Sequence, residues 1–557
     1  MYKVKNITKE KIYLKEVIKI TTRNASRGVL ILTLTNVLSK ILSLVYIPLL
    51  IINIGEAGYG NYGSAYLIYT FVYMVTIAGS SSAIPKLISE YSATGHERDA
   101  MASFKLGRTF LIGMGVLMTI LLLLFTNVFV KMTGFDNSKI AIYALAPAIL
   151  ITAVSSAYRG YFQGRNNLVP LGISQFIEQA LNVVLSLICS FALMKISLPW
   201  GVAGGAIGTA VGALASVIYL KIKYDKDLKV RGRVKSEPRK HSNQHIVRYI
   251  FKYSWPLIVS ALILYAGNNV FDQIIINRSL EWLGYTQTDA STLFAYFNQY
   301  LSLINLPMIL ISSIALSVFP IIARENASED KTKLREGIDK LFKLGFMISL
   351  PAAIGLSVLS APIYHFIFFK MSNTSGSILM RFGGYVFIFS SIYQLTVTMI
   401  NSLGKVKSGT ATALVSVAIR LIVDIIFVRI AFINIYGAVI GLLLSNYIGM
   451  LLNMRIVEKH TKTKESYLRN IIKPAIAAAI MGVVMYFVYL AVGAIIGFVL
   501  GAPTNANFAG YISNAISLGI TGYIGGIVYL QVMIKIKGMN SEDLAIFPRK
   551  IRRLFFA

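Results

Sequence analysis

Long apolar runs dominate this chain and decide what it can fold into. About fourteen stretches, each of roughly twenty or more mostly apolar residues, follow one another, and each is long enough to cross the bilayer core as an α-helix. They lie near residues 28-54, 63-91, 104-130, 138-159, 169-195, 200-222, 250-277, 292-320, 338-360, 378-402, 408-432, 434-457, 471-498 and 508-534. Lipid satisfies no backbone polar groups, so such spans must be helical. The sequence therefore predicts an all-α polytopic membrane protein.

The composition supports a lipid environment and argues against binding to nucleic acid. Hydrophobic residues make up 55% of the chain and charged residues only 14%, whereas soluble domains carry about 25% charged residues. The formal net charge is +30, but the basic residues are scattered between apolar runs, whereas a nucleic-acid-binding surface gathers them on one face. The single cysteine, Cys189, provides no disulfide framework and no cysteine-based metal site.

Lys and Arg residues concentrate in alternate loops. The rich set comprises Lys3 to Arg27, Lys86, Arg98, Lys105, Arg108, Arg159, Arg165, the Lys221 to Lys252 cluster, Arg324 to Arg335, Lys405, Lys407, Arg455 to Lys473 and Lys535 to Arg553. The other set offers little more than Lys131, Lys195, Arg278, Lys370 and Arg429. Cytoplasmic loops hold the excess of basic residues, so we expect both termini in the cytoplasm of a multi-pass plasma- or inner-membrane protein that also contacts anionic lipids.

Two halves of the chain share short motifs. Ser82-Ala-Ile-Pro85 with Glu90 matches Ser317-Val-Phe-Pro320 with Glu325, and the glycine-rich start of the run 200-222 matches that of 434-457. Both offsets are about 235 residues. Each half holds six runs, an even number, so we expect two six-helix lobes related by a pseudo-twofold axis along the membrane normal.

This repeat predicts the domain organisation. We expect a basic cytosolic arm at 1-27, an N-lobe at 28-222, a cytosolic linker at 223-249 and a C-lobe at 250-457. Two further spans at 458-535 have no counterpart in the repeat, and a basic cytosolic tail at 536-557 follows them.

Polar residues inside the spans are the candidate site residues, because an ionisable group at the bilayer centre costs about 2.5 to 3.5 kcal/mol on insertion scales. Asn36, Ser39 and Lys40 form one stripe of the first span, and Asn269, Asp272 and Gln273 one side of the seventh. Glu178 lies in the fifth span, and Arg420 precedes Asp424 by one helical turn in the eleventh.

Two interpretations of these residues stay open. In the first, the first and seventh spans line a cavity between the lobes, Lys40 meets an anionic group, and Asp272 or Glu178 handles a hydroxyl-rich or cationic group. In the second, Lys40 is neutralised by a neighbouring carboxylate, and Arg420 pairs with Asp424 to hold helices together. Asp272, Glu178 and Asp424 are also candidates for coupling to a proton or sodium ion.

Enzymatic chemistry finds no support. The five histidines are not spaced as metal ligands, and no phosphate-binding glycine-rich loop with a lysine is present. We expect neither a cofactor nor a bound metal. We expect a transporter driven by an ion gradient or by the movement of a charged substrate down its own electrochemical potential.

Several motifs resemble a known family. They include Leu38-Ser39-Lys40-Ile41-Leu42, Gly55-Glu-Ala-Gly58-Tyr59-Gly60 and Pro85-Lys86-Leu-Ile-Ser-Glu90, then Arg159-Gly160-Tyr161-Phe162-Gln163-Gly164, and in the second half Leu350-Pro351-Ala352-Ala353-Ile354-Gly355. With these motifs the chain resembles the multidrug/oligosaccharidyl-lipid/polysaccharide exporter superfamily, on the side of the spore-cortex and lipid II flippases. Lipid II flippases place an Arg-Asp pair where this chain has Tyr46-Ile47, which disfavours lipid II itself.

The resemblance implies a two-lobed, V-shaped helical fold, as in multidrug exporters of the MATE type, that alternates between inward- and outward-open states. It implies a flippase that moves a polyprenyl-diphosphate-linked oligosaccharide to the outer leaflet, with glycan polymerase or glycosyltransferase components as candidate partners. The alternative is a cation-coupled multidrug antiporter of the MATE type. A lipid II flippase proper and a non-transporting scaffold for glycan synthesis are less favoured.

Overall fold

The computed structural model describes residues 2–231, 238–327, 331–368, 374–461, 467–499 and 508–539, with side chains before residue 31 and at some later positions outside that description. All secondary-structure elements of this part are helical. The predicted all-α class is confirmed. The predicted tail at 536-557 lies almost wholly outside the described residues, as do the side chains of Ser317 and Pro320 from the repeat motif.

Contacts divide the chain into two compact units, Met1–Ile274 and Ile275–Ala557. The first contains α1 (Tyr2–Ile77), α2 (Ser80–Ala93), α3 (Glu97–Thr133), η1 (Asp136–Ser138), α4 (Lys139–Gly164), α5 (Val169–Met194), α6 (Leu198–Arg231), α7 (Asn243–Tyr265) and η2 (Ala266–Phe271), and α8 (Asp272–Trp282) crosses the boundary. Contacts thus group the span at 250-277 with the first unit, and the lobe boundaries stay a prediction.

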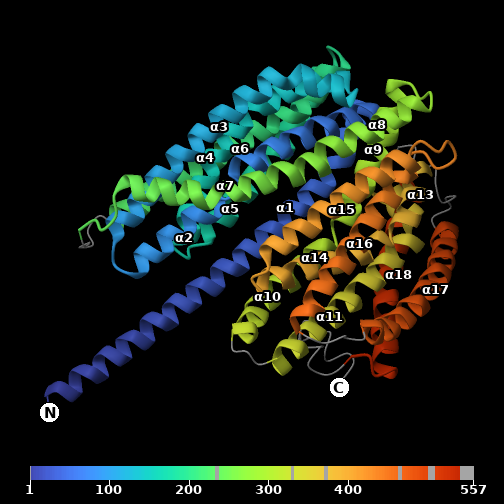
Figure 1. Cartoon of the computed structure of the whole chain (residues 1–557). Helices are drawn as coiled ribbons and strands as arrows, with labels where there is room; N and C mark the ends of the chain where they lie inside the picture. The colour runs from blue at the N-terminus through green and yellow to red at the C-terminus, as the bar shows by residue number, and fades with distance from the viewer. Residues whose placement is uncertain are drawn as a thin grey trace. The chain divides into compact units, whose positions relative to one another are not determined.

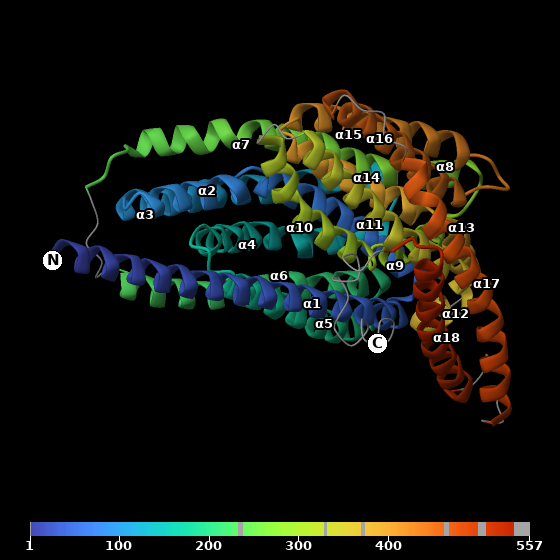
Figure 2. The same ribbon diagram turned by 90° about the horizontal axis from the view of Figure 1, so that it is seen from below.

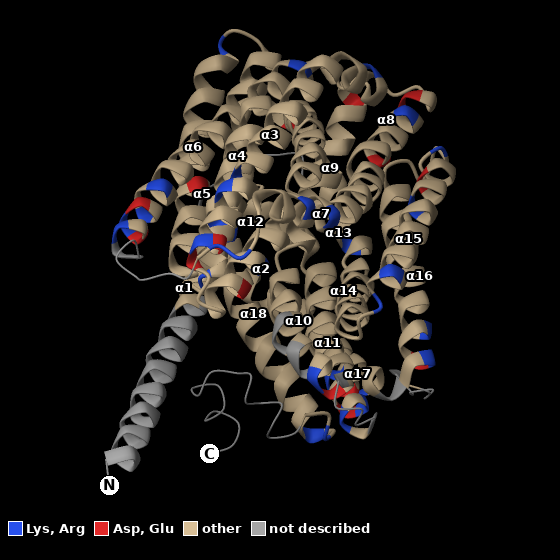
Figure 3. Cartoon of the chain, turned by 60° about the vertical axis from the view of Figure 1, so that its left-hand side comes forward, with Lys and Arg blue, Asp and Glu red and all other residues tan. Residues whose placement is uncertain are grey.

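The second unit contains the remaining helices (Figure 1). They are α9 (Gln287–Ile304), α10 (Met308–Ala327), α11 (Lys331–Val358), α12 (Ser360–Ile367), α13 (Thr374–Gly383), α14 (Val386–Ser402), α15 (Val406–Phe427), α16 (Tyr436–Thr461), α17 (Tyr467–Val499) and α18 (Phe508–Lys535). Figure 3 shows long stretches of helix without charged residues, as lipid-crossing segments require.

Eleven helical stretches among the described residues are long and apolar enough to cross a membrane, or thirteen if two bent pairs each form one span. One of the eleven, Ile31–Ala93, covers 63 residues, which is about three times the length that a bilayer core requires. It is interrupted at Gly55, whose φ of 73° is open to glycine and strained for other residues. Its two arms match the first two runs of the sequence, and the count of fourteen spans stays a prediction.

Glycines bring pairs of helices into close contact in both units. A side chain at Gly204 or Gly208 of α6 would overlap the backbone of α5, and one at Gly437 or Gly441 of α16 would overlap residues of α15. The predicted similarity between the runs at 200-222 and 434-457 therefore corresponds to the same packing role. In Figure 2, α5 and α6 run alongside each other accordingly.

Two predicted spans are bent. The run at 292-320 breaks between α9 and α10, with a bend of 45°, where Pro307 precedes α10, and the run at 378-402 breaks between α13 and α14, with a bend of 51°. Proline lacks a backbone donor and ends helices in this way. The second break follows Gly383 and Gly384, and the first of these lies against the Tyr300 ring.

The last two helices, α17 and α18, pack along each other and against α11 and α12 of the same unit (Figures 1 and 2). The Tyr529 hydroxyl of α18 donates to the Met347 carbonyl of α11 at 2.8 Å. The Asn514 amide donates to the Pro362 carbonyl at 3.0 Å. The appended pair is therefore joined to the second unit by specific hydrogen bonds as well as by apolar contact.

Candidate functional site

Helix α1 presents three different faces in its first membrane-length arm. Tyr46 and Leu50 are buried, whereas Leu34 and Ile41 are exposed to 56% and 52%. At about 100° per residue, Lys40 points about 80–120° away from each of these four residues. Asn36 and Lys40 are exposed there, and Ser39 is half-buried beside them. The polar stripe predicted from the sequence is thus distinct from both the packed face and the exposed apolar face.

Lys40 is not among the described residues of the first unit that form ion pairs. None of the described carboxylates of the first unit forms an ion pair with it, although ion pairs are found elsewhere in the unit. The alternative in which a neighbouring carboxylate neutralises Lys40 gains no support from these contacts. A lysine near mid-depth in a span is costly unless it meets water or an anion.

The second polar group lies where α7 gives way to a π-helix. Residues Ala266–Phe271 adopt this wider helix, which is rare and frequent at functional sites. Asn269 is half-buried in it, and Asp272 and Gln273, which follow it, are 3% and 0% exposed. Both amide atoms of Gln273 are buried without a hydrogen-bond partner among the described residues, so Gln273 is available to bind a ligand or water.

Helix α1 supplies further polar side chains opposite this segment. Gly79 lies against the backbone of Ser254, and α1 also contacts η2. The two helices are antiparallel, so counting back from Gly79 and forward from Ser254 places Ser64 about level with Asn269, and Asn61 about level with Asp272. Asn61 and Ser64 are buried. Neither residue was predicted as a site residue from the sequence, although polar residues inside a span are a usable signal.

Glu178 is held in an ion pair. The Arg159 guanidinium of α4 donates to the Glu178 carboxylate of α5 at 2.5 Å, and to the Ser174 and Ser216 hydroxyls at 3.1 Å each. The two charged side chains are 14% and 23% exposed. The expectation that Arg159 is a loop residue is wrong: it lies inside α4, five residues before the helix ends. Glu178 thus has a partner that the sequence did not reveal, and its role in coupling or binding stays a prediction.

Arg420 and Asp424 are buried in α15. Their closest charged atoms are 3.8 Å apart, one helical turn from each other. Gly441 of α16 lies directly against the Asp424 carboxylate. The pair therefore sits at the α15–α16 packing contact, which favours the interpretation that it holds helices together, and ion coupling through Asp424 stays a prediction.

A row of tyrosines along the second arm of α1 was also missed. Tyr59, Tyr62, Tyr66, Tyr69 and Tyr73 alternate at three- and four-residue spacing, and their consecutive ring centroids are 5.5–6.1 Å apart. The spacing places them on one face of the helix and could have been read from the sequence. Glu178 lies within electrostatic range of Tyr66 and Tyr73. The row therefore leads along the inside of the first unit to the Arg159–Glu178 pair.

Comparison with known proteins agrees with this architecture. The lipid II flippase MurJ of Bacillus subtilis (strain 168) is 22% identical over 527 residues, which cover 90% of this chain and 94% of MurJ. Stage V sporulation protein B of the same organism is 28% identical over 316 residues, covering 56% of this chain and 60% of that protein.

Solved structures share the fold. A lipid II flippase MurJ in an inward closed conformation superposes with a TM-score of 0.65 at 17% identity, covering 91% of this chain and 99% of that one. An inward-facing MATE transporter of the MOP superfamily superposes with a TM-score of 0.64 at 14% identity, covering 77% and 96%. The predicted resemblance to this exporter superfamily is confirmed. The relatives are flippases and transporters, not enzymes.

The family model described as "Polysaccharide biosynthesis protein" matches residues 25–326, more than half of the chain. With its membrane-length helices and its MATE-like fold, the chain belongs to the polysaccharide biosynthesis protein family, as a flippase of the MOP exporter superfamily.

Proposed function

We propose that this chain flips a polyprenyl-diphosphate-linked oligosaccharide from the cytosolic to the outer leaflet of the cell membrane by alternating access. The observation that carries the proposal is the exposed polar stripe of α1, where none of the first unit's described carboxylates forms an ion pair with Lys40. A cation on a polar face of a lipid-crossing helix suits a ligand that brings an anion and hydrogen-bonding groups. A diphosphate joined to a sugar has both.

In this proposal, Lys40 binds the diphosphate while Asn36 and Ser39 bind hydroxyl groups beside it. Asn269, Asp272 and Gln273 contact the sugar, since amides and carboxylates bind sugar hydroxyls readily. The relative named lipid II flippase supports a lipid-linked substrate. Anionic lipids and glycan polymerase or glycosyltransferase components are the proposed neighbours, and both termini lie in the cytoplasm.

The membrane potential supplies a driving force in the needed direction. With the cell interior negative, each negative charge moved outward gains about 2.3 kcal/mol per 100 mV. That is a factor of about 50 in the equilibrium between the leaflets for each charge. A diphosphate is thus driven outward without nucleotide hydrolysis.

A second function is favoured by one observation. Asp272 is a buried acid beside a π-helix in a membrane-crossing stretch, and a carboxyl group in this setting suits proton- or sodium-coupled export of small cations. The fold is shared with a multidrug MATE transporter, so this antiporter activity is the competing proposal.

A protection assay in proteoliposomes separates the two. A fluorescent polyprenyl-diphosphate oligosaccharide becomes accessible to an external modifying reagent only when it is flipped. We expect flipping by the wild type, loss of flipping in Lys40→Ala and partial recovery in Lys40→Arg. Cationic dye export under a pH gradient, with no flipping by well-folded wild type, would instead support the antiporter.

A further inference from the structure

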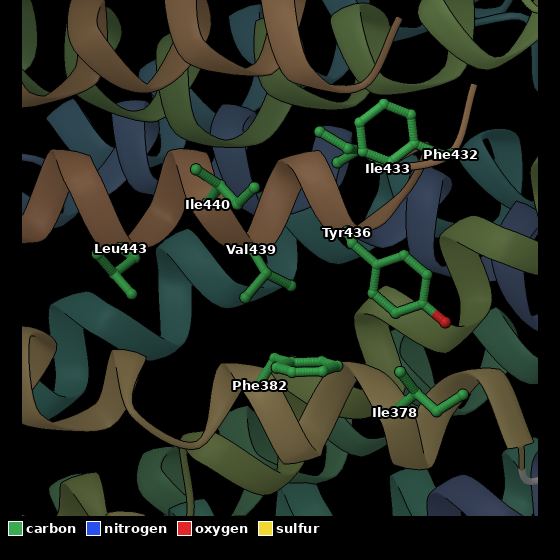
Figure 4. Close-up of a pocket in the computed structure, with 8 residues that line it drawn as sticks. All are labelled: Ile378, Phe382, Phe432, Ile433, Tyr436, Val439, Ile440 and Leu443. Carbon is green, nitrogen blue, oxygen red and sulfur yellow. The ribbon is translucent and has the colours of Figure 1, made fainter. Parts of the chain in front are cut away.

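An apolar groove runs between α13 and α16 in the second unit (Figure 4). Its volume is about 480 Å³, within the range of about 300–1,000 Å³ typical of ligand sites. Ile378 and Phe382 line it from α13, and Val439, Ile440 and Leu443 line it from α16. In Figure 4, Val439 and Leu443 point from α16 toward α13, and Phe382 and Ile378 lie on the facing side of α13, so apolar side chains of both helices line the groove.

The α13 side of this groove lies next to the bend between α13 and α14. The two helices meet at 51°, so α13 departs from the line of α14. Phe382 and Phe432 at the groove are exposed to 64% and 85%. Two neighbouring aromatic side chains with this much exposed surface are favourable only in contact with another apolar group. In a membrane-crossing chain that group is a hydrocarbon chain.

The groove belongs to the outer half of the bilayer under the predicted orientation. Both α13 and α16 begin at the non-cytoplasmic end of their runs, so both enter the membrane in the same direction. The ten residues of α13 rise about 15 Å, which is half of the hydrocarbon core. An occupant would therefore be a lipid tail of the outer leaflet.

One cation lies beside the groove. Arg381 is exposed on α13, between Ile378 and Phe382 in sequence. None of the described carboxylates of the second unit forms an ion pair with it. Arg381 falls within the apolar run at 378-402 but was not predicted as a site residue from the sequence. Its planar guanidinium suits bidentate binding of a phosphate group.

We propose that this groove holds the isoprenoid tail of the anionic lipid carrier and that Arg381 binds a phosphate of the same lipid. The inference rests on the proposed flippase function, since it names where the flipped lipid is received. The groove suits the long apolar tail of such a lipid. The Arg381 guanidinium, on the short helix α13 that lines the groove, suits its phosphate.

Photocrosslinking tests the inference. The full chain is reconstituted in phosphatidylcholine nanodiscs with a polyprenyl diphosphate that carries a diazirine in its tail, and adducts are mapped by mass spectrometry. We expect adducts on α13 and α16 that unlabelled polyprenyl diphosphate reduces about tenfold. Leu443→Trp, which fills the groove, should reduce them several-fold. Val483→Trp, at a 60% exposed position of α17, is the matched control and should leave them unchanged.

Two outcomes would overturn the inference. One is equal labelling by a diazirine phosphatidylcholine, which would identify ordinary boundary lipid. The other is an absence of adducts in the groove while the wild type still flips lipid-linked sugar, which would leave the proposed function intact. Arg381→Gln should weaken labelling by the diphosphate probe but not by an uncharged polyprenol probe, with Arg381→Lys intermediate. If Leu443→Trp does not fold, Ile378→Trp replaces it.

Discussion

The Arg159–Glu178 pair should stabilise the first unit. Arg159 joins three helices, because it donates to Glu178 and Ser174 of α5 and to Ser216 of α6 from its place in α4. Replacing Glu178 by alanine would leave the guanidinium partly buried with only two hydroxyl acceptors. Replacing Arg159 by alanine would leave a carboxylate in the same place without its cation.

The size of the effect follows from the burial of the pair. Removing one partner of a buried ion pair costs about 3 to 5 kcal/mol. The Arg159 and Glu178 side chains are 14% and 23% exposed. Because they are only partly buried, we expect each single variant to lose about 3 kcal/mol of unfolding free energy, at the lower end of this range. At about 2 °C per kcal/mol for a unit of this size, the Tm should fall by about 6 °C.

The assay is thermal unfolding of detergent-solubilised protein for Arg159→Ala, Glu178→Ala and the double variant. If the two groups stabilise the protein through each other, the double variant loses no more than the more damaging single one, so a double-mutant cycle gives a coupling of about 2 kcal/mol or more. Lys105→Ala, at an exposed position of α3, should leave the Tm unchanged. Additive losses would refute the reasoning, as would a Tm unchanged by either single variant.

Three further predictions concern packing and hydrogen bonds. Gly208→Ala should lower the free energy of unfolding by about 1 to 3 kcal/mol, because the new methyl group would overlap Ser186 and the Asn182 carbonyl. Gly113→Ala is the control and should leave the Tm unchanged, since its methyl group would meet no neighbour within 4 Å. Equal Tm shifts in the two variants would contradict this prediction. Thr412→Val should lower stability by about 1 to 3 kcal/mol, since the Thr412 hydroxyl donates to Asn453 at 2.5 Å. The half-buried Thr410→Val is its control, because the Thr410 hydroxyl donates to the Val406 carbonyl of the same helix. Asp99→Ala should speed hydrogen exchange of the Lys240 backbone amide, which donates to the Asp99 carboxylate at 2.8 Å. Glu90→Ala is the control. Equal exchange rates in the two variants would show that this hydrogen bond does not protect the Lys240 amide.

Much of the fold could be predicted from the sequence, because the helices are determined by residues close together in the chain. Apolar runs of membrane length indicate the helices. The glycines near 204 and 437 indicate close helix packing, since both halves of the chain have glycines at the same place where two helices touch. The polar stripe of α1 could also be predicted, because helical periodicity alone places Asn36 and Lys40 on one face.

The remaining features depend on contacts between distant residues. Nothing near Arg159 in the sequence shows that Glu178, on another helix, is its partner, so the guanidinium was assigned to a loop. No short sequence pattern marks the π-helix before Asp272 or the 51° bend after α13, and the groove joins residues of α13 and α16 that are far apart in the sequence. These features required the structure.

The central claim is outward movement of an anionic lipid-linked sugar, and its most direct test is the flipping rate of the purified wild type in proteoliposomes under an imposed potential. The potential is set by a potassium gradient with valinomycin, negative on the side that corresponds to the cytoplasm. The account predicts that the fluorescent polyprenyl-diphosphate oligosaccharide accumulates in the opposite leaflet, and that reversing the potential reverses the accumulation, by a factor of about 50 per charge per 100 mV at equilibrium. Absence of flipping by folded protein at either polarity would contradict the account.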